Sequence, residues 1–111
     1  MRIATFNVNG VNGRLPRLLE WLHETRPDVA CLQEIKTSDP RFPIEALREA
    51  GYDAVWHGQP RHHGVAVLAR DGAPIELRRG LPSDGEDGQA RYLEARAGGL
   101  RIASVYLPNG N

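Results

Sequence analysis

Two oxygen-bearing side chains stand at the ends of two short apolar segments of this 111-residue chain. Asn7 closes the segment 2–7, and Glu34 closes the segment 28–34. A third segment, 104–109, also ends in polar residues. An amide oxygen and a carboxylate are hard ligands, which suit Mg²⁺ or Mn²⁺ and suit zinc poorly. The residue types therefore indicate a divalent-metal site, or alternatively a turn at Asn7 and a solvent-exposed strand end at Glu34.

The first third of the chain has the pattern of a strand, a helix and a strand. Segment 2–7 is short and apolar-rich and runs into turn-forming residues. Leucines recur at helical spacing within 14–23, and the continuous apolar run 29–33 is typical of a strand buried on both faces. If the two strands pair in parallel through a right-handed crossover, Asn7 and Glu34 emerge side by side at the sheet edge where ligands bind.

The rest of the chain predicts more strands than helices. Gly98-Gly99, between two apolar segments, is a strong hairpin signal. A short helix is predicted at 43–50, and strands are predicted at 52–56, 64–69, 75–79, 91–97 and 100–107. The sequence has no internal repeat and no linker, so we expect residues 1–111 to form one α/β domain, with a mixed sheet and flanking helices.

Composition sets limits on function. Fourteen basic and fourteen acidic residues leave no net charge, so the total gives no evidence for nucleic acid, although a local basic cleft is compatible with it. Nearly all basic residues are arginine, which suits phosphate contacts, but coding bias yields the same composition. The single cysteine, Cys31, lies in an apolar run and is predicted to be a buried structural thiol. With no long apolar stretch and no signal-peptide pattern, we expect a cytoplasmic protein without a membrane partner.

Several short motifs in this order resemble a known superfamily. The segment 6–10 followed by 32–36 resembles the opening of the endonuclease/exonuclease/phosphatase superfamily, and most closely its exonuclease III branch. Further motifs of that branch match Phe42-Pro43, Gly51-Tyr52, His57-Gly58-Gln59, the segment 64–68, and the catalytic-tyrosine motif at 106–110. Each motif alone is weak, but their order and spacing together are specific, and they cover essentially the whole chain.

The resemblance implies a fold and an activity. The fold would be the N-terminal half of a four-layer α/β sandwich of the DNase I type, so that residues 1–111 form a partial domain. The activity would be Mg²⁺- or Mn²⁺-dependent hydrolysis of phosphodiesters in duplex DNA during base-excision repair, especially at abasic or nicked sites.

The resemblance also assigns roles residue by residue. Glu34 matches the carboxylate that holds the metal, and Asn7 matches the asparagine beside it. Tyr106 matches the catalytic tyrosine near the scissile phosphate, where its phenol can donate to a phosphate oxygen. Asn109 and Arg91 match residues that contact the DNA.

Two further polar positions follow from the same comparison. His62 and His63, in the loop before Gly64, either bind phosphate beside the site or are solvated loop histidines. Asn9 takes the place of a carboxylate found in many relatives, which makes it a candidate for the outer metal shell.

Two motifs that the resemblance leads us to expect do not occur in this sequence, namely Gly-Asp-x-Asn and Ser-Asp-His. We therefore expect the chain to be incomplete and inactive alone, and either self-associated or paired with a complementing C-terminal half. A non-catalytic remnant or association module is the alternative function. A superfamily phosphoesterase for lipid head groups or inositol phosphates is a third, which the His57-Gly58-Gln59 motif disfavours.

Overall fold

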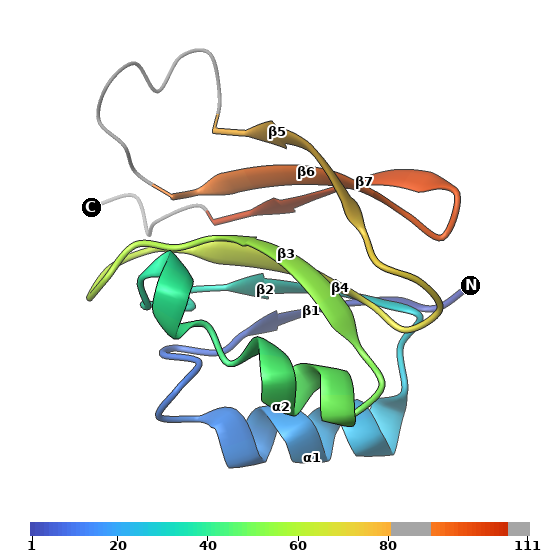
Figure 1. The fold of residues 1–111 in the computed structure, drawn as a ribbon, viewed down its shortest axis with the longest axis horizontal. Helices are drawn as coiled ribbons and strands as arrows, with labels where there is room; N and C mark the ends of the chain where they lie inside the picture. Colours follow the sequence, from blue (N-terminus) through green and yellow to red (C-terminus); the bar gives the residue numbers. More distant parts are fainter. Residues whose placement is uncertain (81–89, 107–111) are drawn as a thin grey trace.

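The computed structural model describes residues 1–80 and 90–106, which form three layers: two helices, a four-stranded sheet and a three-stranded sheet (Figure 1). In chain order the elements are β1 (Ile3–Asn7), α1 (Leu15–Thr25), β2 (Val29–Gln33), a 3₁₀ helix (Asp39–Arg41), α2 (Ile44–Glu49), β3 (Asp53–His57), β4 (Val65–Ala69), β5 (Ile75–Arg79), β6 (Tyr92–Ala97) and β7 (Leu100–Val105). The mixed α/β fold predicted from the sequence is confirmed.

The first sheet has the strand order β1-β2-β4-β3. β1 and β2 are parallel, with Asn7 opposite Gln33, and α1 provides the crossover between them, as the strand–helix–strand pattern predicted. β4 lies between β2 and β3 and is antiparallel to both. This insertion joins residues 29–33 to residues 65–69, and no local sequence pattern predicted it.

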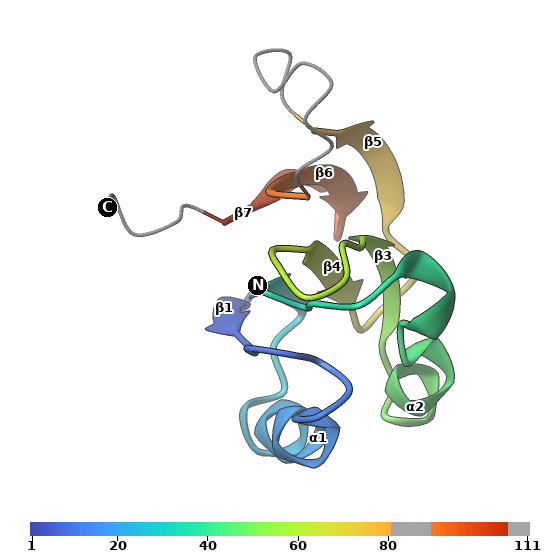
Figure 2. The same ribbon diagram turned by 90° about the vertical axis from the view of Figure 1, so that its left-hand side faces the viewer.

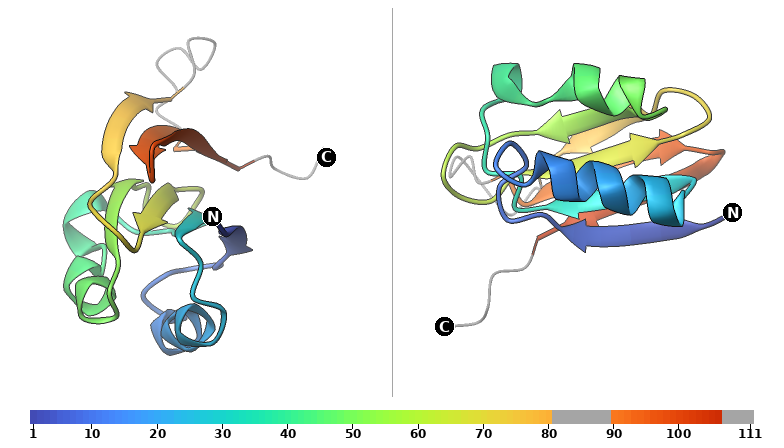
Figure 3. Two further views of the ribbon diagram at one scale, coloured as in Figure 1. Left: turned by 90° about the vertical axis from the view of Figure 1, so that its right-hand side faces the viewer. Right: turned by 90° about the horizontal axis from the view of Figure 1, so that it is seen from below.

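The helices cover one face of the first sheet, as the view from below shows (Figure 3). Leucines at helical spacing in the two helices pack against leucines of the sheet. The helix residues are Leu18 and Leu22 of α1 and Leu47 of α2, and the strand residues are Leu32 of β2 and Leu68 of β4. All five side chains are buried. α1 ends where Arg26 adopts a left-handed backbone conformation and its N–H bonds the Leu22 carbonyl. This core fixes the direction in which β1 and β2 present their carboxyl ends.

The second sheet is antiparallel, with the order β5-β6-β7. The predicted hairpin is confirmed: Gly98 and Gly99 have φ angles of 58° and 79° and join β6 to β7, as a two-residue turn requires. The sheet packs on the face of the first sheet that the helices leave open (Figure 2). Cys31, Val67 and Leu93 are among the buried residues of the core between the sheets, so the interpretation of Cys31 as a buried thiol is confirmed.

Large apolar side chains that remain exposed lie on the outer strands of both sheets. They are Met1, Ile3, Ile75, Leu77, Leu100 and Val105, which belong to β1, β5 and β7 or precede them. Within residues 1–80 and 90–106, neither α-helix is long and apolar enough to cross a membrane.

Candidate active site

The carboxyl ends of β1 and β2 bring Asn7 and Glu34 to the same edge of the first sheet. Asn7 pairs with Gln33, and Glu34 is the residue immediately after β2. The chain then stays paired past the strand ends, because the Gly10 N–H donates to the Glu34 carbonyl at 2.8 Å and the Val8 N–H donates to the Gln33 carbonyl at 3.0 Å. The predicted side-by-side placement of these two residues is therefore present in the fold.

Several non-glycine residues around this edge have left-handed backbones. Glu34, Lys36 and His63 have φ angles of 54°, 49° and 44°. Such a conformation is unfavourable for a residue with a Cβ by about 1–2 kcal/mol. Hydrogen bonds hold it in place: the Lys36 N–H donates to the His63 carbonyl at 3.0 Å, and the Ile35 N–H donates to the Gly64 carbonyl at 3.1 Å. The two loops are therefore hydrogen-bonded to each other at this edge.

Lys36 is a site residue that sequence reasoning missed. Its Nζ donates to Asn9 Oδ1 at 2.6 Å, and the Asn9 N–H donates to Asn7 Oδ1 at 3.2 Å. This chain of contacts fixes the Asn7 amide and places an ammonium group within reach of an anion. The signal was available, because Lys36 is the only lysine in the sequence and follows Glu34 by two residues.

Tyr106 reaches the site from the second sheet. It follows the end of β7, its N–H donates to the Arg91 carbonyl at 2.8 Å, and its ring packs partly buried against the core between the sheets. Burial raises the pKa of the phenol, and a hydrogen bond to the Glu34 carboxylate together with its charge raises that pKa further, while Arg91 opposes the shift. The hydroxyl therefore stays protonated at neutral pH and can act as a hydrogen-bond donor.

His63 and Arg91 lie beside Tyr106. The rings of His63 and Tyr106 have centroids 5.5 Å apart and are tilted by 41°. Burial lowers the pKa of His63, and the charges of Arg91 and His62 lower it further, against the opposing charge of Glu34. In the described part of the chain, His63 Nδ1 and Arg91 Nε are buried without a hydrogen-bond partner. The structure thus brings the predicted residues Glu34, Tyr106, His63 and Arg91 together.

The two remaining predicted site residues are placed differently. His62 is exposed, and its ring centroid lies 5.9 Å from that of His63. Asn109 lies outside the described residues.

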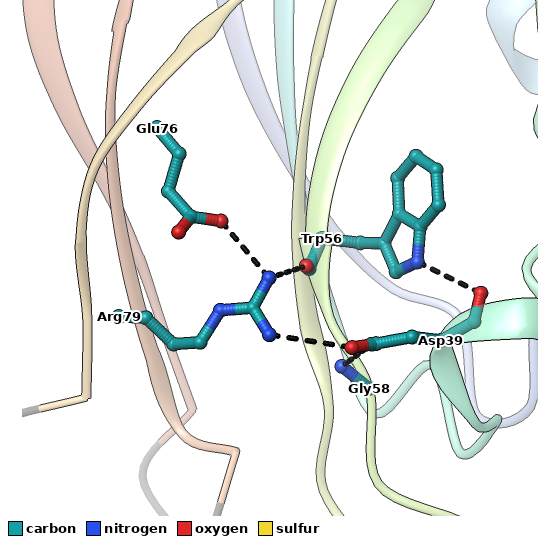
Figure 4. Close-up of polar contacts among 5 residues, drawn as sticks. All are labelled: Asp39, Trp56, Gly58, Glu76 and Arg79. Atoms are coloured by element: carbon teal, nitrogen blue, oxygen red, sulfur yellow. Dashed lines mark hydrogen bonds and ion pairs between the residues drawn. The ribbon is translucent and has the colours of Figure 1, made fainter.

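A polar network anchors the start of the loop that carries His63 (Figure 4). Asp39 Oδ1 accepts the Gly58 N–H at 2.7 Å, and the Asp39 carbonyl accepts Trp56 Nε1–H at 3.1 Å. Arg79 of β5 lies 3.2 Å from Asp39 Oδ2 and donates to the Trp56 carbonyl at 2.9 Å. A Cβ at Gly58 would overlap the Thr37 carbonyl oxygen, a backbone atom, so only glycine permits this approach.

The other end of the loop is anchored on the second sheet. The Gly64 N–H donates to the Ala90 carbonyl at 2.7 Å, and Gln59 Oε1 accepts the Ala90 N–H at 2.8 Å. Gly64 has a φ of +90°, and a Cβ there would lie 2.5 Å from Ile35 Cγ1. The loop is therefore fixed to both sheets on either side of His63.

The donor set fits one hydrated divalent cation. Asn7 is exposed and Glu34 is half-buried, so solvent can reach both residues. No group of three or more His, Cys, Asp and Glu side chains that could hold a metal occurs within residues 1–80 and 90–106. One carboxylate and one amide suit Mg²⁺, which keeps several of its waters, better than they suit zinc or a fully protein-bound ion.

Residues 4–109 match the model of the Endonuclease/Exonuclease/phosphatase family. The chain belongs to this family. The match spans both sheets and all the site residues described above, and it confirms the superfamily indicated by the sequence motifs.

Relatives within the family resemble the chain along its whole length. It is 40% identical to exodeoxyribonuclease III of Haemophilus influenzae over 99% of this chain and 42% of that protein. A 3′ phosphatase from Neisseria bound to a product DNA hairpin is 40% identical, with a TM-score of 0.92 over 99% of this chain and 42% of that one. An AP endonuclease from Archaeoglobus fulgidus is 34% identical, with a TM-score of 0.89 over 97% of this chain and 41% of that one. The chain spans about two-fifths of the length of these relatives.

Proposed function

We propose that this chain carries the metal- and tyrosine-bearing part of a DNA phosphodiesterase that acts in repair on duplex DNA, especially at abasic or nicked sites. The observation that carries the proposal is that the ends of the two sheets meet here: the Tyr106 ring lies against His63, whose carbonyl accepts the N–H of Lys36, two residues after Glu34. The names of the relatives support the same reading, because they include an exodeoxyribonuclease, an AP endonuclease and a phosphatase bound to a DNA hairpin.

In this proposal Glu34 and Asn7 hold Mg²⁺ or Mn²⁺. When bound, such an ion supplies Lewis-acid polarisation of a phosphate and stabilises the leaving oxygen. Glu34 would orient the ion through its carboxylate, and the Asn7 amide, which Asn9 and Lys36 fix, would supply a second oxygen. Tyr106, kept protonated by burial and by Glu34, would donate its hydroxyl proton to a phosphate oxygen.

The cationic side chains around Tyr106 suit a phosphate backbone. Lys36 and Arg91 place positive charge at this edge, although the chain as a whole carries no net charge. Arg91, together with Asn109 and His62, would contact the DNA strand beside the reacting phosphate. Arg91 can contact phosphate oxygens in the planar, bidentate manner of guanidinium groups.

A complementing C-terminal half is part of the proposal. The sequence lacks the Gly-Asp-x-Asn and Ser-Asp-His motifs that would orient and deprotonate the attacking water, so we propose that a complementing half supplies them and that the chain alone is inactive. The exposed apolar side chains on β1 and β7, Ile3, Leu100 and Val105, favour association with another chain. They equally support the alternative function, a non-catalytic association module. The unpaired thiol of Cys31 fits a cytoplasmic location.

The experiment is a complementation assay on a labelled duplex with one abasic-site analogue. The chain is tested alone and mixed with the part of the Haemophilus influenzae exodeoxyribonuclease III that it does not cover, with Mg²⁺ present or chelated. We expect cleavage only in the mixture with Mg²⁺. Glu34→Ala should lower it more than about 100-fold, because loss of even an outer-shell metal residue lowers activity about 10–100-fold. Tyr106→Phe should lower it about 100-fold through loss of one phosphate donor.

Glu45→Ala is the matched control, since Glu45 is an exposed carboxylate on α2. Cleavage that persists in the Glu34→Ala mixture would contradict the nuclease proposal. A stable complex of the two polypeptides without any cleavage would support the association module instead.

A further inference from the structure

Tyr106 lies just beyond the end of the second sheet. β7 ends at Val105, and Tyr106 lies one residue beyond the last pair of the ladder, in which Tyr92 faces Val105. Its N–H bonds the Arg91 carbonyl, which positions the backbone but does not set the side-chain torsions. The direction of the phenol therefore depends on the side chains that pack against the ring.

His63 is the aromatic side chain in contact with that ring. The centroid separation of 5.5 Å and the tilt of 41° fall in the range of favourable aromatic pairs, about 4.5–7 Å. The Glu34 carboxylate acts on the hydroxyl end, where it raises the pKa of the phenol, whereas His63 contacts the ring. These two contacts act at different points of the side chain and add to the packing of the ring against the core between the sheets.

The backbone of His63 is itself held in place. Its carbonyl accepts the Lys36 N–H, and the next residue, Gly64, donates to Ala90 and accepts from Ile35. The start of the same loop is tied to Asp39 through the Gly58 N–H (Figure 4). His63 is thus a fixed support rather than a mobile loop residue, although its φ of 44° is unfavourable for a residue with a Cβ.

The contact is one of packing. His63 Nδ1 is buried and has no hydrogen-bond partner among residues 1–80 and 90–106. Burial, with the charges of Arg91 and His62, lowers the His63 pKa and so favours the neutral ring, against the charge of Glu34. A neutral ring packs against an aromatic neighbour without the desolvation penalty of a charged one.

We propose that His63 is a positioning residue that holds the Tyr106 ring so that its hydroxyl meets Glu34. This role deepens the proposed function, on which its kinetic consequence rests, and it differs from the phosphate contact predicted for His63 from the sequence. His62, exposed and adjacent, keeps that predicted role.

The decisive measurement is an NMR experiment on the chain with labelled tyrosines and glutamates. The sequence has three tyrosines, and Tyr106→Phe assigns the signal of interest. Wild type should give a nuclear Overhauser effect (NOE) between the Tyr106 ring protons and the Glu34 side-chain protons. His63→Ala should abolish it, and His63→Phe should retain it because the ring is restored. Tyr52, which bonds the Pro27 carbonyl, is the internal reference for an intact fold.

His62→Ala is the matched control, because it removes the neighbouring imidazole and should leave the Tyr106–Glu34 NOE in place. Should His63→Ala fail to fold, His63→Leu, which has similar volume and no aromatic ring, takes its place. In the complementation assay, His63→Ala should lower kcat more than it raises KM, and His63→Phe should restore kcat.

Persistence of the Tyr106–Glu34 NOE in a folded His63→Ala or His63→Leu chain would overturn the positioning role. Its loss in His63→Phe would also overturn it, because the ring alone would not suffice. Absence of DNA cleavage by the wild-type mixture would count against the proposed function alone, since the NOE does not depend on activity.

Discussion

The two sheets differ in how their strands are buried. In the first sheet every residue of β4 and four of the five residues of β2 are buried, because helices cover one face and the second sheet covers the other. In the second sheet all five residues of β5 are exposed, and β6 buries only alternate residues. The first sheet therefore carries most of the core, while the second adds one packed face to it.

The candidate site takes residues from both sheets. Glu34 and Asn7 come from the well-buried sheet, and Tyr106 and Arg91 come from the other. The geometry of the site therefore depends on how firmly the second sheet is held against the first. Four sets of substitutions test this difference between the sheets, beginning with the largest expected effect.

The first prediction compares two leucines, one in each sheet. Leu68→Ala in β4 should lower the free energy of unfolding by about 2–5 kcal/mol, because the side chain is fully buried and its loss leaves a cavity. Leu77→Ala in β5 should lower it by less, because Leu77 is already 38% exposed. Urea unfolding followed by tryptophan fluorescence measures both. Equal losses would show that the two sheets contribute alike.

The second prediction breaks the polar connection between the sheets. Ser104 is fully buried, and its Oγ donates to the Leu32 carbonyl at 2.9 Å and accepts from Gln33 Nε2 at 3.3 Å. Ser104→Ala should lower the free energy of unfolding by about 1–3 kcal/mol, because it leaves buried polar groups without partners. The control is Ser38→Ala, whose side chain makes no capping hydrogen bond. A Ser104→Ala chain as stable as the control would mean that packing alone joins the sheets.

The third prediction concerns the stability at low pH that depends on Asp28, the residue before β2. A hydrogen bond from the Arg2 N–H, and then one from Arg70, hold the pKa of Asp28 below its usual value of 3.8. A folded pKa below the unfolded one means that this stabilisation is complete above about pH 4 and is lost as the pH falls through the folded pKa. Asp28→Asn should therefore reduce the loss of stability below pH 4 in thermal melts from pH 2 to 6. Parallel pH curves for wild type and variant would contradict the assignment.

The smallest expected effect has the opposite sign. The second sheet places glycines at both left-handed positions of its hairpin, whereas the loop between β3 and β4 places Arg61 at a φ of 69°. Arg61 is exposed, so Arg61→Gly should raise the free energy of unfolding by up to about 1 kcal/mol through relief of the backbone. Arg41→Gly, at an exposed position of the 3₁₀ helix without a left-handed backbone, should not raise it. Destabilisation by Arg61→Gly would show that its side chain outweighs the strain.

Much of the fold could be predicted from local sequence patterns. The apolar run at 29–33 predicted a strand buried on both faces, and Gly98-Gly99 predicted the hairpin, because burial and turn chemistry act over a few neighbouring residues. The parallel pairing of β1 and β2 also followed, since one helix separates them. The placement of β4 between β2 and β3 did not, because it depends on contacts between distant residues.

The site was predicted less completely than the fold. Strand ends and motifs identified Asn7, Glu34 and Tyr106, but their roles stay predictions. The bond of Lys36 to Asn9 and the packing of His63 on Tyr106 depend on left-handed backbones at Lys36 and His63. Asn, Asp and His are enriched in the left-handed conformation, but residue type alone does not identify which positions adopt it.

Cys31 gives the molecule an internal reporter. The thiol lies in the core between the sheets, and burial raises its pKa to about 11. Alkylating reagents attack the thiolate, so they can react with Cys31 only when the two sheets separate and water reaches the sulfur. Because it is the only cysteine in the chain, the rate at which a bulk sample takes up one alkyl group counts the opening events of the sandwich.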